Sequence, residues 1–188
     1  MEKKGTLFVI SAPSGAGKTT LVGQVLKKIP QLFYSISHTT RKPRTGEIHG
    51  KDYYFIDEPE FQTLIDQDLW IEWAQVHGNF YGTSKAFVTK KLEAGENILL
   101  DIDVQGAKQI MNSKLGLVSV FILPPSIEVL RQRLENRGTD SKTVISHRME
   151  NAQLEIDQQS AYDHVIVNDE IDQAIADLCS ILENEMRS

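Results

Sequence analysis

The sequence predicts an α/β fold in which helices cover both faces of a parallel β-sheet. Two observations predict it: short apolar runs typical of buried strands recur along the 188 residues, and stretches with apolar residues at helical spacing separate them. With 40% hydrophobic residues, the chain has enough apolar side chains for the core of one globular domain. No apolar run reaches the roughly 20 residues that a membrane-spanning helix needs.

Strands and helices are expected to alternate along the chain. Four apolar runs predict strands: TLFVI at 6–10, NILLDID at 97–103, VSVFIL at 118–123 and DHVIVN at 163–168. Helices are predicted in five other stretches: 21–29, 84–94, 126–136, 141–159 and 170–186. The last helix either pairs two copies of the chain or closes the core, and we favour closure of the core.

Two segments break this alternation. Residues 37–83 are rich in Thr, Tyr, Gly, Pro and charge, and we interpret them as a mixed insertion. Residues 126–160 are highly polar and predict a mobile lobe. We therefore expect a central sheet with two inserted parts.

Charge and cysteine content narrow the function classes. The formal net charge is −6, which disfavours a general nucleic-acid binder, so any anion site has to come from local Arg and Lys residues. Cys179 is the one cysteine, so the chain forms no intrachain disulfide, and a reducing cytoplasm is the expected compartment. Because Cys179 lies in an apolar helical pattern, we expect it in the core.

A glycine-rich stretch directly follows the first predicted strand. It reads A-P-S-G-A-G-K-T from Ala12 and matches the phosphate-loop pattern G-x-x-x-x-G-K-[ST] except at its first position. Gly15 and Gly17 allow the backbone angles that turn successive N–H groups inward. Lys18 supplies positive charge for the β- and γ-phosphates, and Thr19 a hydroxyl ligand for Mg²⁺. The alternative is a turn with a capping threonine, which the order strand, loop, helix disfavours.

In the second predicted strand, Asp101 directly follows the apolar run ILL at 98–100. A carboxylate there resembles the aspartate that helps to hold Mg²⁺ near a phosphate loop, and the alternative is a residue that caps a turn. The following DVQG also fits the D-x-x-G of GTPases, but no N-K-x-D is present to bind guanine in their manner. The GTPase interpretation is therefore disfavoured.

The stretch between the loop and Asp101 predicts a second binding site. SISHTTRKPRTGE carries Ser37, Arg41 and Arg44, and arginine forks suit bidentate binding of phosphate. The hydroxyl of Tyr53 could donate to the same phosphate. The alternative for the two arginines is a solvated basic loop.

Glu72 and Thr83 match the hydrogen-bonding groups of guanine. A carboxylate accepts from the adjacent N1–H and N2–H₂ donors, and a hydroxyl donates to O6. Adenine has no N1–H and would leave a buried carboxylate unpaired, so a site of this kind discriminates strongly. Taken alone, Glu72 would be interpreted as an exposed helix residue.

These motifs together resemble guanylate kinases over nearly the whole chain. The matching stretches are SAPSGAGKTT, SHTTRKPRTGE, HGKDYYF, EWAQVHGNFYGTS, LDIDVQGA, ILPPS, RLENRGTDS and VIVNDE. The resemblance implies transfer of the γ-phosphate of ATP to GMP, with dGMP as an expected second acceptor and Mg²⁺ as cofactor, in purine nucleotide metabolism. It also implies a P-loop NTPase-type parallel sheet core. The domain would span 5–184, with core segments 5–36, 84–125 and 161–186, a GMP-binding region at 37–83 and a helical lid at 126–160.

The resemblance assigns roles to residues at matching positions. ATP would be bound by Ala12, Pro13, Ser14, Gly15, Ala16, Gly17, Lys18, Thr19, Thr20, Arg133, Arg137 and Asn168. GMP would be bound by Ser37, Arg41, Arg44, Tyr53, Glu72, Tyr81, Gly82, Thr83, Asp101, Asp103 and Arg148. Catalysis would rest on Lys18, Arg44, Arg137 and Arg148, and Mg²⁺ on Thr19 and Asp101. Two positions depart from the common pattern. Ala12 stands in place of the first glycine of the phosphate-loop motif, and Val104 stands where family members often carry Met or Trp.

The expected chemistry needs no general base. The acceptor is a phosphate monoester with a second pKa of about 6, so it is mostly a dianion at neutral pH. His38, His49 and His77 therefore receive no catalytic role. Two rivals are a phosphopeptide-binding module with this fold and a kinase for another nucleoside monophosphate. The intact Lys18–Thr19 motif disfavours the first and the Glu72–Thr83 pair the second. We expect no nucleic-acid or membrane partner, and a homodimer stays open.

Overall fold

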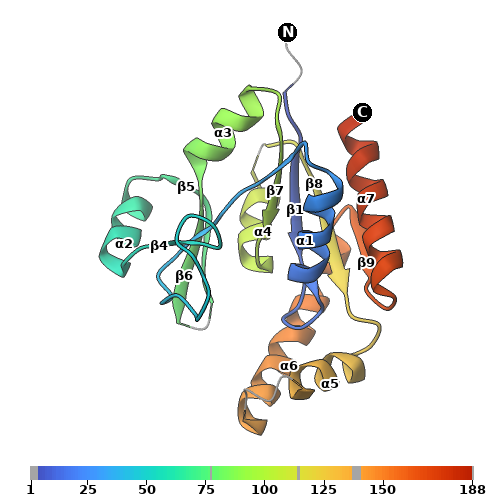
Figure 1. The fold of residues 1–188 in the computed structure, drawn as a ribbon. Coiled ribbons are helices and arrows are strands. Elements are labelled where there is room, and N and C mark those ends of the chain that lie inside the picture. Colours follow the sequence, from blue (N-terminus) through green and yellow to red (C-terminus); the bar gives the residue numbers. More distant parts are fainter. Residues whose placement is uncertain (1–3, 77, 114, 137–140, 188) are drawn as a thin grey trace.

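The computed structural model describes residues 4–76, 78–113, 115–136 and 141–187. A five-stranded sheet with helices on both faces forms the centre, and the predicted α/β class is confirmed (Figure 1). A four-stranded sheet lies to one side of this core, and a pair of helices lies at its lower end in the view of Figure 1. No helix in these described ranges is long and apolar enough to cross a membrane.

All neighbouring strands of the central sheet are parallel. Their order is β2 (Leu32–Tyr34), β7 (Asn97–Asp101), β1 (Leu7–Ser11), β8 (Leu117–Leu123) and β9 (His164–Val167). The four strands predicted from apolar runs are confirmed. Strand β2 was not predicted, because three residues are too few to produce a strand pattern and only the pairing with β7 identifies them.

Strand β1 is buried on both faces, so its alternate side chains enter two cores. Phe8 and Ile10 pack with α1 (Lys18–Lys28) and α7 (Ile171–Arg187). Leu7 and Val9 pack with α3 (Lys85–Glu93) and α4 (Val104–Met111). Helix α7 closes the first core, as expected, and the half-buried Cys179 packs against it.

The mixed insertion forms the second sheet, in the order β4 (Tyr54–Phe55), β3 (His38–Thr39), β6 (Asn79–Ser84) and β5 (Trp70–Val76). Helix α2 (Glu58–Asp66) packs on it through Phe61, whose ring stacks on Trp70 at 4.6 Å. A Cβ at Gly82 would lie only 2.9 Å from Phe61 Cζ. Glycine at this position therefore lets the helix lie close to the sheet.

Helices α5 (Ile127–Asn136) and α6 (Lys142–Ile156) form the polar lobe around a small core of their own. That core contains Leu130, Leu134, Ile145, Met149 and Ala152. The helix expected at 141–159 ends at Ile156, and a short 3₁₀ turn follows at Gln159–Ala161.

Candidate functional site

The glycine-rich loop joins the carboxyl end of β1 to helix α1. Gly15 and Gly17 have φ angles of 99° and 95°, which residues that carry a side chain rarely adopt. Gly17 begins the helix without any side-chain cap, so the first backbone N–H groups of α1 have no capping partner of that kind. Such N–H groups, together with the helix dipole, form an anion site.

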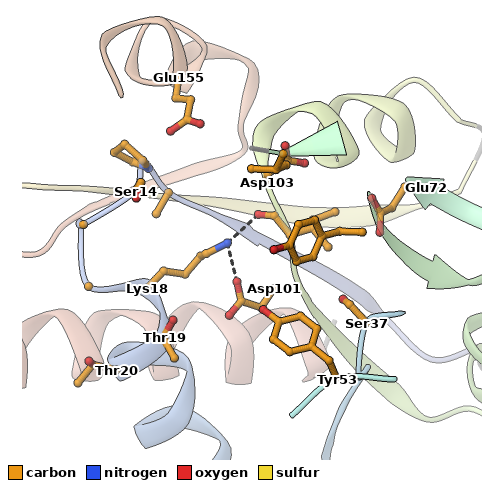
Figure 2. A pocket seen from close by; sticks show the side chains of 17 residues that line it. Ser14, Lys18, Thr19, Thr20, Ser37, Tyr53, Glu72, Asp101, Asp103 and Glu155 are labelled. Atoms are coloured by element: carbon orange, nitrogen blue, oxygen red, sulfur yellow. Dashed lines mark hydrogen bonds and ion pairs between the residues drawn. The ribbon is translucent and has the colours of Figure 1, made fainter. Parts of the chain in front are cut away.

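Lys18 lies next to the end of the neighbouring strand (Figure 2). Its Nζ is 2.5 Å from Asp101 Oδ1 and donates to the carbonyl oxygen of Ile102 at 2.8 Å. The parallel register pairs Asp101 with Ile10 of β1, which brings the carboxylate to the base of the loop. The structure therefore brings together the lysine and the aspartate that the motifs predict.

Thr19 and Asp101 both line the cavity beside the loop and offer oxygen donors. Hydroxyl and carboxylate oxygens are ligands that Mg²⁺ accepts, and it usually completes its shell with substrate phosphates and water. Within the described ranges, no cluster of three or more His, Cys, Asp or Glu residues could hold a metal by itself. These residues fit a magnesium ion that binds together with a nucleotide.

Glu72 lies in strand β5 at the other end of the site and is only 4% exposed. The interpretation of this residue as an exposed helix position is therefore wrong. The fully buried hydroxyl of Thr83, on the adjacent strand β6, donates to Glu72 Oε1. Burial raises the pKa of Glu72 to about 7, the bond from Thr83 opposes this shift, and nearby Asp103 adds to it.

Asp103 is the N-cap of helix α4. Its Oδ1 accepts the backbone N–H of Gly106 at 2.9 Å, which holds the carboxylate at the helix start. Burial raises the pKa of Asp103, and the Gly106 N–H and Lys18 oppose that shift. Two carboxylates of this site, Glu72 and Asp103, thus lie side by side in a poorly solvated place.

The predicted phosphate-binding arginines lie at the edge of the site. Arg41 forms a bidentate pair with Glu47 at 2.8 and 2.9 Å, and its guanidinium lies 5.3 Å from the ring centroid of Tyr53. The backbone N–H of Arg44 also donates to Glu47, while the Arg44 side chain is exposed. Glu47 was missed as a functional candidate, although it lies within the same motif, because its pairing depends on the fold of the loop.

One cavity of about 360 Å³ joins the two ends of the site. It is lined by the loop from Ala12 through Thr20, Ala16 excepted, and by Asp101 and Asp103. At the end away from the loop its walls include Ser37, Tyr53 and Glu72 (Figure 2), and Tyr81 lines it as well. Arg41, Arg44, Gly82 and Thr83 are not among the lining residues. The Thr83 hydroxyl, expected to donate to O6 of guanine, donates to Glu72 in this structure.

The helical pair contacts the loop from its outer side. Arg133 of α5 donates to the carbonyl oxygens of Ala16 at 3.3 Å and Asn168 at 3.1 Å. The buried side chain of Asn168 donates to the same Ala16 carbonyl at 2.7 Å. Arg148 of α6 lines an adjoining cavity of about 310 Å³, and the predicted Arg137 lies outside the described residues.

Glu155 was not predicted at all. It lies on α6, lines both cavities and faces the loop at Ser14 (Figure 2). Burial raises the pKa of Glu155 to about 7, Asp103 adds to the shift, and the Ser14 backbone and Lys18 oppose it. Its position within a polar helix gave no sequence signal, because only the packing of α6 brings it to the loop.

A phosphate loop that shares one cavity with a buried polar pocket on a separate sheet is the arrangement of a P-loop kinase acting on a small acceptor. The family model of guanylate kinase matches residues 4–185. The chain is 50% identical to a guanylate kinase of Geobacter sulfurreducens over 182 residues, which cover 97% of this chain and 90% of the relative. For a guanylate kinase of Neisseria gonorrhoeae, the identity is 48% with coverage of 96% and 88%. The crystal structure of guanylate kinase from Anaplasma phagocytophilum superimposes with a TM-score of 0.81 at 35% identity, covering all of this chain and 89% of that one. The chain belongs to the guanylate kinase family.

Proposed function

We propose that this protein transfers the γ-phosphate of ATP to GMP, giving ADP and GDP. One observation carries the proposal: Glu72, buried and held by Thr83, lines the same cavity as the loop that carries Lys18. A triphosphate on the loop and a guanine at Glu72 would place donor and acceptor phosphates between the two ends of one cavity.

Guanine is the base that this pocket suits. Thr83 already uses one oxygen of Glu72, and the carboxylate remains an acceptor toward the cavity for the N1–H and N2–H₂ of the base. Asp103 beside it adds a second acceptor. Because both carboxylates are poorly solvated, a base without these donors would leave them unpaired at substantial cost.

The chain's own residues bind and orient the phosphates. The acceptor phosphate is already a dianion at neutral pH, so no side chain has to remove a proton. Lys18 would move from its pairing with Asp101 to the transferred phosphoryl group, and Arg44 and Arg148 would neutralise charge from either side. Thr19 and Asp101 would hold Mg²⁺, which would neutralise charge on the phosphates of the donor.

The remaining assignments are proposals of the same kind. We assign Ser37, Arg41, Tyr53 and Tyr81 to the GMP phosphate, and residues 37–83 and 126–160 to a GMP-binding region and a lid. We further propose dGMP as a second acceptor, a role in purine nucleotide metabolism and a cytoplasmic location.

A coupled assay of ADP release, run with GMP, dGMP, AMP, UMP and no acceptor, tests the function. GMP should give rapid turnover, dGMP measurable turnover, and the other three conditions little. Equal rates with GMP and AMP would contradict the guanine assignment. A phosphopeptide-binding module would show no acceptor-dependent turnover at all.

A further inference from the structure

We infer that Gly106 is a positioning residue for guanine recognition, because the absence of a side chain there lets the Glu72 carboxylate lie against helix α4 beside Asp103. The inference rests on the proposed function, since it concerns how the acceptor pocket selects its base.

The contact between Gly106 and Glu72 is too close for any larger residue. A Cβ built at Gly106 would overlap Glu72 Oε2, and it would lie 3.0 Å from Glu72 Cδ and 3.3 Å from Asp103 Oδ1. Both carboxylates of the base pocket would therefore meet the first atom of any side chain. Gly106 itself is buried in the first turn of α4.

The requirement for glycine at this position is one of space and not of backbone conformation. The described glycines with positive φ are Gly15, Gly17, Gly46, Gly50, Gly78 and Gly95, so Gly106 has the ordinary helical conformation that alanine also adopts. Alanine has the higher helix propensity, and in a helix without this contact it would be favoured.

Gly106 also fixes the second carboxylate. Its N–H donates to Asp103 Oδ1 at 2.9 Å. Glu72 is thus confined between the Thr83 hydroxyl on one side and the Cα of Gly106 on the other, with Asp103 held next to it. A single backbone position sets the separation of the two acceptors that the base would meet.

A side chain at position 106 should harm recognition more than folding. The nearest atoms that it would meet belong to the far end of the Glu72 side chain, which can shift by rotation about its own bonds while the backbone of α4 stays in place. Thr83 is fully buried in the sheet and cannot follow this movement. The displaced carboxylate would then no longer align with the donors of the base.

Gly106→Ala is the test, and Gly23→Ala is its matched control. Gly23 lies in the middle of helix α1, and a Cβ there would meet nothing within 4 Å. We expect Gly106→Ala to raise the KM for GMP about 10- to 100-fold, the effect of misplacing hydrogen bonds to a charged group. The KM for ATP, kcat at saturating GMP and the melting temperature should stay close to those of the parent, and Gly23→Ala should leave the KM for GMP unchanged.

A double-mutant cycle separates action through Glu72 from distortion of α4. In a Glu72→Ala background the carboxylate nearest to the new Cβ is absent, and the remaining neighbour, Asp103 Oδ1 at 3.3 Å, has to give way only slightly, so adding Gly106→Ala should raise the KM for GMP no further. The same rise in both backgrounds would overturn the inference, as would an unchanged KM in the single variant. If the Gly106→Ala variant does not fold, adding Glu72→Ala should restore folding. A double variant that also fails to fold would overturn the inference. A parent enzyme without preference for GMP over AMP would instead overturn the proposed function, and this inference with it.

Discussion

Replacing Glu72 with Gln should weaken the use of GMP and, at alkaline pH, stabilise the free protein. The amide oxygen of Gln can still accept from Thr83, so the pair in the sheet is kept. The other oxygen becomes an NH₂ group that faces the N–H donors of guanine. Hydrogen bonds to charged groups contribute about 1.5–3 kcal/mol each, so kcat/KM for GMP should fall about 10- to 100-fold. The KM for ATP should not change.

The gain in stability follows from the raised pKa of Glu72. Burial moves that pKa from 4.5 to about 7, which corresponds to about 3 kcal/mol of unfavourable free energy when the folded protein holds the group ionised. The stability linked to this carboxyl is fully present below pH 4.5 and is lost as the pH rises through 7. Glu72→Gln cannot ionise, so at pH 8 its melting temperature should exceed that of the parent by about 6–12 °C. At pH 5 most of this difference should be absent.

Steady-state kinetics and ligand-free thermal unfolding at pH 5 and pH 8 measure both effects. Glu93→Gln, on the exposed surface of α3, removes a carboxylate without touching the site and serves as control. Unchanged kcat/KM for GMP, or equal melting temperatures of parent and variant at pH 8, would refute the reasoning from buried charge.

Three further outcomes are expected. Lys18→Ala should lower kcat at least about 100-fold with the melting temperature little changed, and normal turnover would remove the loop from the mechanism. The KM for GMP should fall as the pH rises through about 7, because Glu72 binds the base as a carboxylate. Glu72→Gln should abolish this pH dependence. A pH-independent KM in the parent would contradict the role of this carboxylate. Arg133→Ala, which loses its bonds to Ala16 and Asn168, should raise the KM for ATP about 5- to 10-fold with no effect on GMP. Arg131→Ala, at an exposed position of the same helix, is the control. An equal rise in the KM for ATP in this variant would show that the loss of any positive charge on α5 has this effect, and would contradict a specific role of Arg133.

The phosphate loop could be predicted from the sequence because its structure is local. Two glycines and a lysine, placed between a strand and a helix, determine the backbone angles and the direction of the N–H groups within a few residues. The partner Asp101 could also be predicted, since the carboxyl ends of parallel strands meet at one edge of the sheet.

The acceptor end could be predicted only in part, because its geometry depends on contacts between distant segments. Glu72 and Thr83 were recognised by their chemistry, but their burial arises from the pairing of β5 with β6. The engagement of Arg41 by Glu47 depends on how the loop folds back on itself. Helices α2 and α4 were missed, because both are too short for their apolar residues to form a long periodic pattern.

The seating of helix α5 on the glycine-rich loop has a consequence for how the molecule can move. Leu130 and Leu134 pack so close to Gly15 that a Cβ on this glycine would lie 3.0 and 3.1 Å from their side chains. Arg133 donates a hydrogen bond to the carbonyl oxygen of Ala16. Helix α5 thus packs against the outer side of the glycine-rich loop. Any motion that carries α5 away from the sheet must break the Arg133 hydrogen bond to Ala16 and expose the outer side of the loop to water, so such a motion would change the surroundings of the proposed ATP site.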